Sequence, residues 1–390
     1  MENEKLVPKL RFSGFDDEWK ISNLGDISSN EMYGMNSAAK EYDGKNKYIR
    51  ITDISETSNK FVPNPLTSPS GDLETKFKLQ DGDIVFARTG ASTGKSYLYD
   101  KNDGNLYFAG FLIKFHIDKA VPKFIFYNTL KQEYLYWVSV MSVRSGQPGI
   151  NSNEYKKLPI NLPSYEEQKK ISDFLELIDN KIRLLEKKYK SYQDFKKYLM
   201  QQIFAQKLRF DFDTFKLKDL SKINKGKQLN KDDMVENGEY YVLNGGKEPS
   251  GYTNSWNTPE NTITISEGGN SCGFVNYNEE KFWSGGHCYY LSDLSKNLDD
   301  YYLFSYLKFI EPKIMRLRVG SGLPNIQKGD IENIKIKIPP MKEQLKISNL
   351  LLSVDKKINS IVFQKDNFEI FKKGLLQQMF DNMLLIQYNL

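Results

Sequence analysis

The chain has 390 residues, of which 27% are charged and 13% aromatic, a composition that predicts about two or three folded domains and excludes a disordered chain. Its net charge of +5 excludes a chain that is basic throughout, so any surface for nucleic acid must be a local patch. Two cysteines exclude a disulfide framework, and no apolar run reaches about 18 residues, so we expect a cytoplasmic protein with no membrane segment.

The first globular segment is predicted over residues 1–160. It opens with "WKISNLGDI" (Trp19–Ile27), continues through strand-like runs such as "DIVFAR" (Asp83–Arg88) between Gly/Asn-rich turns, and closes with a helix-like piece around 124–137. Its 21 Lys and Arg residues almost balance its 20 Asp and Glu residues, so it has no overall basic character.

A long helix is predicted over residues 161–207. Its apolar residues recur at alternating steps of four and three, the spacing of a coiled-coil seam, and Pro163 marks where the helix can begin. Lys196 breaks the run with a polar side chain. The seam positions that we predict are Ile171, Leu175, Ile178, Ile182 and Leu185.

The second globular segment is predicted over residues 208–337. It repeats the outline of the first with "FKLKDLSKI" (Phe215–Ile223), the strand-like run "TITIS" (Thr262–Ser266) and a helix-like piece around 301–309. The interiors of the two segments otherwise share little sequence, so we expect their globular parts to differ.

A second long helix is predicted over residues 338–390. The pair Pro339-Pro340 marks its beginning, and Lys365 and Lys372 are its polar breaks. Its predicted seam positions are Ile347, Leu351, Val354, Ile358 and Ile361.

The two helical segments are copies of one another. With an offset of 176 residues, 17 of the 43 positions over 162–204 and 338–380 are identical.

If the ends of the second globular segment lie close together, the second helix begins beside the end of the first, and the pair runs antiparallel. Forty helical residues make a rod of about 60 Å. The sequence therefore predicts an α+β protein: two mixed globular domains joined by two long antiparallel coiled-coil helices, with a pseudo-two-fold internal repeat. The alternative is that each helix packs on a globular core as an ordinary amphipathic helix.

The motifs that resemble catalytic or metal sites all depart from the pattern that their chemistry needs. "TGASTGKS" (Thr89–Ser96) leaves three residues between its glycines where a phosphate-binding loop needs four. The Glu-x-Lys spacing of Glu167-Gln168-Lys169 is lost in its duplicate, which reads Glu343-Gln344-Leu345. We therefore predict a tight turn at the first motif and the start of a helix at the second.

Zinc and methyl-transfer chemistry are disfavoured on the same grounds. Cys272, His287 and Cys288 lack the close Cys-x-x-Cys or His-x-x-His spacing of a zinc site, so buried thiols are expected. "IPPM" (Ile338–Met341) has an apolar residue in the polar position of the motif with which methyltransferases hold an amino base. We predict no catalytic residue and no metal site, and an enzyme acting through an unrecognised set of carboxylates stays as an alternative.

The duplicated helix starts, "LPSYEEQKKISDFLELIDNKI" (Leu162–Ile182) and "IPPMKEQLKISNLLLSVDKKI" (Ile338–Ile358), resemble the two conserved regions of the specificity subunits of type I restriction–modification systems, the HsdS family. "PKLRFSGFDDEWKISNLGDI" (Pro8–Ile27) extends the resemblance to essentially the whole chain. The resemblance implies that the two globular segments are target recognition domains, each reading half of a split DNA sequence, and that the helices act as a ruler for the gap.

The resemblance also implies partners. Two methyltransferase subunits would use S-adenosylmethionine to methylate adenines, and restriction subunits would use ATP and Mg²⁺ to translocate and cleave DNA, so this chain itself would hold no cofactor. Two other interpretations remain: a specificity module of a restriction–modification enzyme outside type I, and a coiled-coil scaffold that reads no DNA.

Polar clusters at strand ends supply donors and acceptors suited to the edges of bases in the major groove. In the first segment we predict DNA contacts from Arg88, Thr89, Ser92, Thr93, Lys95, Arg144, Ser145 and Gln147. In the second we predict them from Lys225, Lys227, Asn244, Lys247, Ser266, Glu267, Asn270, Ser271, Arg318 and Ser321. The alternative for any of them is a surface turn or a solvated charge.

Overall fold

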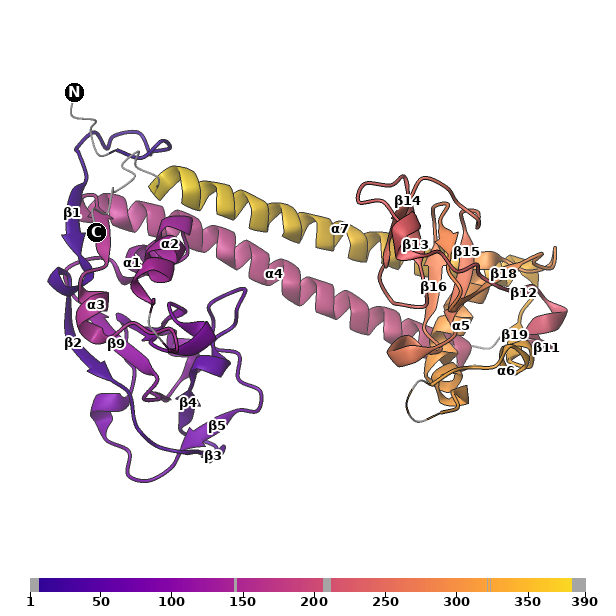
Figure 1. Cartoon of the computed structure of the whole chain (residues 1–390), viewed down its shortest axis with the longest axis horizontal. Coiled ribbons are helices and arrows are strands. Elements are labelled where there is room, and N and C mark those ends of the chain that lie inside the picture. The colour runs from indigo at the N-terminus through magenta and orange to yellow at the C-terminus, as the bar shows by residue number, and fades with distance from the viewer. Residues whose placement is uncertain (1–6, 144–145, 206–211, 321, 323, 381–390) are drawn as a thin grey trace. The chain divides into compact units, whose positions relative to one another are not determined.

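The computed structural model describes residues 7–143, 146–205, 212–320, 322 and 324–380, and the chain is an α+β protein. It divides into a first unit, residues 1–184 and 365–390, and a second unit, residues 185–364. Two 40-residue helices, α4 (Tyr165–Phe204) and α7 (Met341–Phe380), each contribute residues to both units (Figure 1). Both begin two residues or less after the prolines that the sequence identified as their boundary.

The first unit is built on a four-stranded antiparallel sheet with the order β2-β9-β6-β7 and on three two-stranded pairings, β1-β10, β3-β5 and β4-β8. Its strands are β1 (Lys20–Asn23), β2 (Ser28–Tyr33), β3 (Ala39–Glu41), β4 (Lys47–Ile49), β5 (Thr67–Pro69), β6 (Asp83–Ala87), β7 (Ser96–Leu98), β8 (Leu106–Phe108), β9 (Leu112–Ile117) and β10 (Pro159–Leu162). Its short helices are α1 (Pro122–Asn128), α2 (Gln132–Met141) and α3 (Ser152–Lys156).

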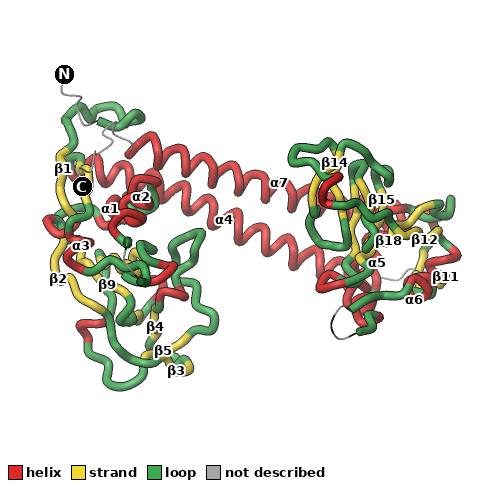
Figure 2. The backbone as a smooth tube through the Cα atoms, in the orientation of Figure 1, coloured by secondary structure: helices red, strands yellow, loops and turns green. Residues whose placement is uncertain are grey.

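The second unit has a four-stranded antiparallel sheet with the order β12-β18-β15-β16, a three-stranded sheet β14-β13-β17 and the pair β11-β19. Figure 2 draws the strands in yellow and the loops between them in green. Its strands are β11 (Asp213–Lys216), β12 (Lys222–Lys225), β13 (Tyr240–Leu243), β14 (Gly251–Thr253), β15 (Thr262–Ser266), β16 (Val275–Asn278), β17 (Trp283–Ser284), β18 (Cys288–Ser292) and β19 (Lys335–Ile338). Its short helices are α5 (Asp300–Ile314) and α6 (Lys328–Glu332).

The globular parts of the two units share one topology, although the sequence predicted that they differ. The four-stranded sheets match strand for strand along the chain, and each unit adds an antiparallel pair next to a long helix (β1-β10, β11-β19) and a parallel pair (β4-β8, β13-β17). Strand pairing uses backbone groups, so the same sheet can form while its side chains diverge. The duplication therefore extends through the whole chain.

Each unit encloses its own apolar core. In the first, every residue of β6 is buried, and Phe86, Phe115 and Phe124 join a cluster that extends onto Leu175 of α4. In the second, Tyr302 and Leu303 of α5 join a cluster that extends onto Leu351 of α7. The long helices are therefore continuous with the domain cores.

Within each unit the segments of α4 and α7 run antiparallel. In the first unit the beginning of α4 shares a core with the end of α7, and in the second the end of α4 shares a core with the beginning of α7. Eight of the ten predicted seam residues are buried, and Ile182 and Ile358 are half-buried.

A buried glutamine in the first turn of each long helix ties that helix to its domain. The Gln168 side chain accepts a hydrogen bond from the Val121 amide at 2.9 Å and donates one to the Pro163 carbonyl at 3.0 Å. Gln344 accepts from the Asp299 amide at 2.9 Å and donates to the Pro339 carbonyl at 3.0 Å. Val121 and Asp299 are the N-cap residues of α1 and α5, whose amides have no partner within their own helices.

Two reciprocal ion pairs fasten the helices where the sequence shows polar breaks in the seam. Lys372 of α7 contacts Asp179 of α4 at 2.6 Å in the first unit, and Lys196 of α4 contacts Asp355 of α7 at 2.6 Å in the second. A domain tyrosine donates to each carboxylate: Tyr127 to Asp179 at 2.8 Å, and Tyr301 to Asp355. Burial, the charge of Asp179 and the hydrogen bond to it raise the pKa of Tyr127, so this hydroxyl remains a donor at neutral pH.

Replacing Asp179 with Asn should destabilise the first unit. The change removes the charge that Lys372 and Tyr127 both contact in a partly buried place, and such charge-assisted bonds contribute about 1.5–3 kcal/mol each to the free energy of unfolding. We expect a lower unfolding midpoint in urea. Asp173→Asn, on an exposed position of the same helix, is the control, and equal midpoints for both variants would contradict a role for this ion pair.

Candidate nucleic-acid interface

The turn after β6 and the turn after β15 have the same backbone. Gly90 and Gly94 have φ of +74° and +89°, and Gly269 and Gly273 have φ of +70° and +86°. This left-handed conformation is one that glycine adopts freely, which explains the shared glycine spacing.

Hydrogen bonds within the protein close both turns. In the first, the Gly90 amide donates to the Pro148 carbonyl at 2.9 Å and the Gly94 amide donates to the Ala87 carbonyl at 3.0 Å. In the second, the Gly269 amide donates to the Pro324 carbonyl at 3.0 Å in the same way. Because these amides are engaged, the loop is a tight turn at the end of a strand, as the sequence predicted, and not a phosphate cradle.

The first turn lies beside the segment that leads into α3, and this contact joins the two predicted groups of the first unit. Thr89 forms a β-bridge with Gly149, and the Ile150 amide donates to the Arg88 carbonyl at 2.9 Å. The Gln147 side-chain nitrogen is 2.9 Å from where a Cβ on Gly90 would stand. Gln147 is exposed and Ser92 is half-buried, whereas Arg144 and Ser145 lie outside the described residues.

Arg88 is the central side chain of the surface formed by the turn after β6 and the segment that leads into α3. Its guanidinium lies 4.9 Å from the ring centroid of Tyr33 and 6.0 Å from that of Phe111, both exposed aromatic residues. Its Nε is buried and has no hydrogen-bond partner among the described residues. Such cation–π contacts hold the planar group in place while they leave its donors unused.

Glu267 is the central side chain of the corresponding face in the second unit. Its Oε1 accepts hydrogen bonds from Lys225 Nζ at 2.7 Å and from the Tyr289 hydroxyl at 3.0 Å, and its Oε2 lies 3.7 Å from Nδ1 of His287. Burial and the hydrogen bond to Glu267 raise the pKa of Tyr289 to about 12. Oε2 is buried and accepts no hydrogen bond from the described residues.

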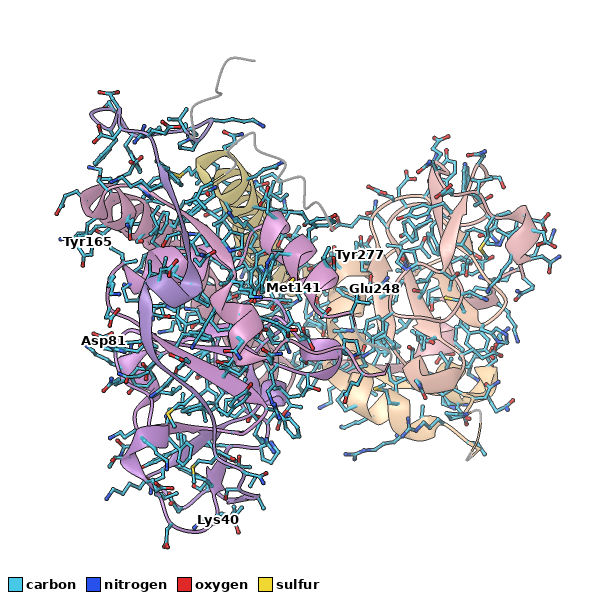
Figure 3. The ribbon with its side chains drawn as sticks, turned by 60° about the vertical axis from the view of Figure 1, so that its left-hand side comes forward. Lys40, Asp81, Met141, Tyr165, Glu248 and Tyr277 are labelled. Atoms are coloured by element: carbon cyan, nitrogen blue, oxygen red, sulfur yellow. The ribbon has the colours of Figure 1, made fainter. Side chains whose placement is uncertain are left out.

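Three further predicted residues of the second unit, Asn244, Lys247 and Lys227, contact other groups of the domain. The Asn244 side chain accepts a bond from the His287 amide at 3.3 Å, in the loop after β13 where Figure 3 labels Glu248. Lys247 Nζ lies 5.6 Å from the ring centroid of Phe274. The carbonyl of exposed Lys227 accepts a bond from the Trp283 indole at 2.8 Å.

Of the four other predicted residues, the three that the structure describes lie in the turn after β15 or in the segment beside it. Asn270 is exposed and Ser271 half-buried in the turn itself. Arg318 is exposed next to Val319, which forms a β-bridge with Asn325, while Ser321 lies outside the described residues.

Protein groups already bond the polar atoms of two predicted contacts. Lys95 Nζ donates to the Ile54 carbonyl at 3.1 Å and pairs with Glu56. Ser266 is buried, and its hydroxyl donates to the Gly245 carbonyl. Thr93 is limited in a similar way, since its hydroxyl donates to the Gly90 carbonyl at 2.7 Å. All of the predicted contacts stay predictions.

Sequence reasoning missed the neighbours of the two central residues: Tyr33 and Phe111 in the first unit and His287 in the second. Phe111 and His287 both follow a glycine in the turn before a strand, in "AGF" and "GGH". Side chains at such turns are exposed, so the signal was present, but only the fold shows that the turns lie beside β6 and β15.

The cysteines are structural. Cys272 lies in the core of the second unit with its thiol against the Glu267 carbonyl, and Cys288 packs with Leu243 and Phe282. Burial raises the pKa of Cys272 and raises that of Cys288 to about 11, which disfavours the thiolate that zinc needs. In the part of the chain that the structure describes, no three His, Cys, Asp or Glu side chains gather as a metal site.

The Glu-x-Lys motif is accounted for by a bidentate ion pair. Glu167 is fully buried and accepts from Nε and Nη2 of Arg11, both at 2.7 Å. Its carboxylate is therefore engaged in fixing the N-terminal segment to α4.

A family model described as the type I restriction modification DNA specificity domain matches residues 16–191 and 210–367. The chain belongs to this family. Its members supply DNA specificity rather than catalysis. The match occurs twice, in agreement with the repeated topology, so this specificity subunit contains two copies of the domain.

Relatives that align with the full chain, or with part of it, are also type I specificity subunits. A putative type I restriction enzyme specificity subunit of Methanocaldococcus jannaschii is 24% identical and aligns over 98% of both chains. A putative type I specificity subunit of Mycoplasma pneumoniae is 32% identical over 36% of this chain and 38% of its own length. The S subunit of a type I restriction–modification system from M. genitalium has the same fold, with a TM-score of 0.68 at 17% identity over 97% of this chain and all of that one.

The helices of this specificity subunit carry many charges. Among its described residues, none of the helices has the length and apolar character that crossing a membrane requires.

Gly94→Ala should destabilise the first unit through the turn after β6. A Cβ there would stand 2.6 Å from Val138 in a left-handed backbone, which we expect to lower the free energy of unfolding by about 2 kcal/mol or more. Gly374→Ala in α7 meets no atom within 4 Å and should instead add about 0.8–1 kcal/mol, since alanine favours helices. Urea unfolding measures both, and a Gly94 variant as stable as the unaltered chain would contradict the tight turn.

Proposed function

We propose that this chain is the DNA-reading subunit of a type I restriction–modification complex and that each unit reads one half of a split target. The proposal rests on one observation: the two units repeat the same backbone, but the polar side chains at their strand ends differ. The turns after β6 and β15 share their backbone, yet one presents Arg88 and the other Glu267. Two readers on one scaffold, each with its own side chains, suit a target whose halves differ.

The long helices set the separation of the half-sites in this proposal. The glutamine anchors and the Lys–Asp pairs occur once in each unit, at positions related by the same offset of 176 residues. They fix each domain to its helices through buried polar contacts. The half-sites would lie roughly one helical turn of DNA apart, so that both major grooves face the protein.

The duplicated helices also suit two copies of one partner. Phe195 and Phe371 are equivalent under the repeat and are 47% and 50% exposed. Exposed apolar residues repeated in this way favour two methyltransferase subunits, which would bind S-adenosylmethionine, together with restriction subunits that would use ATP and Mg²⁺. A scaffold without DNA reading explains the helices but leaves the divergent polar faces without a role.

Replacing residues 28–144 with the matching segment of another specificity subunit should change one half-site only. We expect the chain, expressed with its methyltransferase subunits, to direct adenine methylation to a split sequence, and the exchanged chain to keep one half of it. Methylation-aware sequencing of the host genome reads both halves and the spacer. Loss of sequence preference in both halves of a folded chain would argue against independent readers, and methylation by the chain alone would contradict a non-catalytic role.

Inserting four helical residues after Tyr189 should lengthen the spacer. The insertion adds about 6 Å of rise and offsets the seam by about 40°, which a coiled coil absorbs by local unwinding. Both half-sites should persist, while the spacer grows by about one or two base pairs at about 3.4 Å each. An active insertion variant with the original spacer would disprove the ruler, and Lys190→Ala, an exposed change without insertion, is the control.

A further inference from the structure

We propose that Arg88 and Glu267 are equivalent specificity-determining residues, and that Arg88 selects guanine in one half-site while Glu267 selects cytosine in the other. The inference rests on the proposed function and adds to it the base that one named side chain in each unit reads. It follows from three observations: an identical backbone position, a matched change of neighbours and an unused polar atom on each side chain.

The backbone positions of the two residues are the same. The Arg88 amide donates to the Phe111 carbonyl at 3.0 Å, and the Glu267 amide donates to the His287 carbonyl at 3.0 Å. The carbonyls of Arg88 and Glu267 each accept from an isoleucine amide at 2.9 Å. Both residues come directly after the equivalent strands β6 and β15 and directly before the closed turn.

The surrounding side chains change together with the central one. Beside Arg88 lie the rings of Tyr33 and Phe111, whereas beside Glu267 lie the ammonium group of Lys225 and the imidazole of His287. Phe111 and His287 are equivalent by the backbone bonds described above. A cation is thus surrounded by aromatic faces in one unit, and a carboxylate by nitrogen-bearing side chains in the other.

Tyr33 and Lys225 are also equivalent, because each precedes a glycine that packs against a carbonyl. A Cβ on Gly34 would lie 2.3 Å from the Ala109 oxygen, and one on Gly226 would lie 2.2 Å from the Gly285 oxygen. Only glycine fits at either place, so these glycines fix Tyr33 and Lys225 in the same position in the two units.

Both central side chains keep a buried polar atom without a hydrogen-bond partner among the described residues. Five buried side-chain nitrogen or oxygen atoms in the described residues have no hydrogen bond, and two of them are Arg88 Nε and Glu267 Oε2. Leaving such an atom unpaired costs about 1–3 kcal/mol, so a ligand that pairs with it is favoured. The occurrence of this feature at one equivalent position in both units indicates a shared binding role.

The chemistry of the two groups identifies the bases. The guanidinium offers parallel donors that match O6 and N7 of guanine in the major groove. A carboxylate only accepts, so it pairs with N4 of cytosine, whereas on adenine the N7 acceptor beside the amino group would repel it. Lys225, 53% exposed, covers Glu267 and can turn to a DNA phosphate when the carboxylate meets its base.

Arg88→Gln and Glu267→Gln test the inference in the complete complex with its methyltransferase subunits. A glutamine pairs with N6 and N7 of adenine, so each variant should shift one position of one half-site toward adenine, by about ten- to a hundredfold in relative methylation. The readout is methylation of a DNA library in which every position of both half-sites is randomised. The half-site read by the other unit is the internal control for folding, and Glu280→Gln, the same change at an exposed position, is the matched control.

Unchanged base preference in both variants, or a uniform fall in methylation over all sequences, would overturn the inference and leave the proposed function intact. If Glu267→Gln fails to fold, Glu267→Asp replaces it: the shorter side chain should weaken the cytosine preference at the same position, and an unaltered preference would overturn the inference. The proposed function fails separately, if the unaltered complex methylates no split sequence.

Discussion

The structure depends on one buried hydrogen-bonding arrangement, the glutamine in the first turn of each long helix. The N-cap amide of α1 or α5 has no partner in its own helix, and the Gln168 or Gln344 side chain provides one while it also bonds the carbonyl of the proline before the long helix. One glutamine side chain thus bonds two backbone groups, an amide in the domain and a carbonyl just before the long helix. A change in the angle between α1 or α5 and the long helix would stretch the bond from the N-cap amide to the glutamine, so this contact holds the domain against the helix.

The lysine–aspartate pairs fix the register of the two long helices within each unit. Apolar seam residues tolerate shifts along a helix, whereas Lys196 with Asp355 and Lys372 with Asp179 meet in only one register. The tyrosines that reach the same carboxylates connect the register to the domains. The Gln and the Asp of the repeated phrase, Gln168 and Asp179 with their copies Gln344 and Asp355, therefore hold helix and domain together. None of these residues needs a catalytic role.

In the surfaces proposed to read DNA, the backbone is the same in both units and the side chains differ. Glycines close the turns after β6 and β15 identically, and the side chain directly before each turn is a cation in one unit and an anion in the other. Sequence reasoning selected Arg88 and Glu267 from their place at strand ends. It selected Lys95 and Ser266 on the same grounds, and the structure shows both bonded within the protein, because the partners, Glu56 and the Gly245 carbonyl, come from distant loops.

The sequence by itself determined the two helices, their copies and the places where they begin, because heptad spacing and proline act locally and the duplication can be read at a fixed offset. It also determined that the glycine-rich loop is a turn, since its spacing excludes a phosphate cradle. Only the tertiary structure decided that the globular parts repeat one topology, because strand pairing depends on backbone groups that leave no mark in diverged side chains. It likewise decided that Tyr33 and Phe111 lie beside Arg88, and Lys225 and His287 beside Glu267, since strands far apart in the sequence bring these residues together.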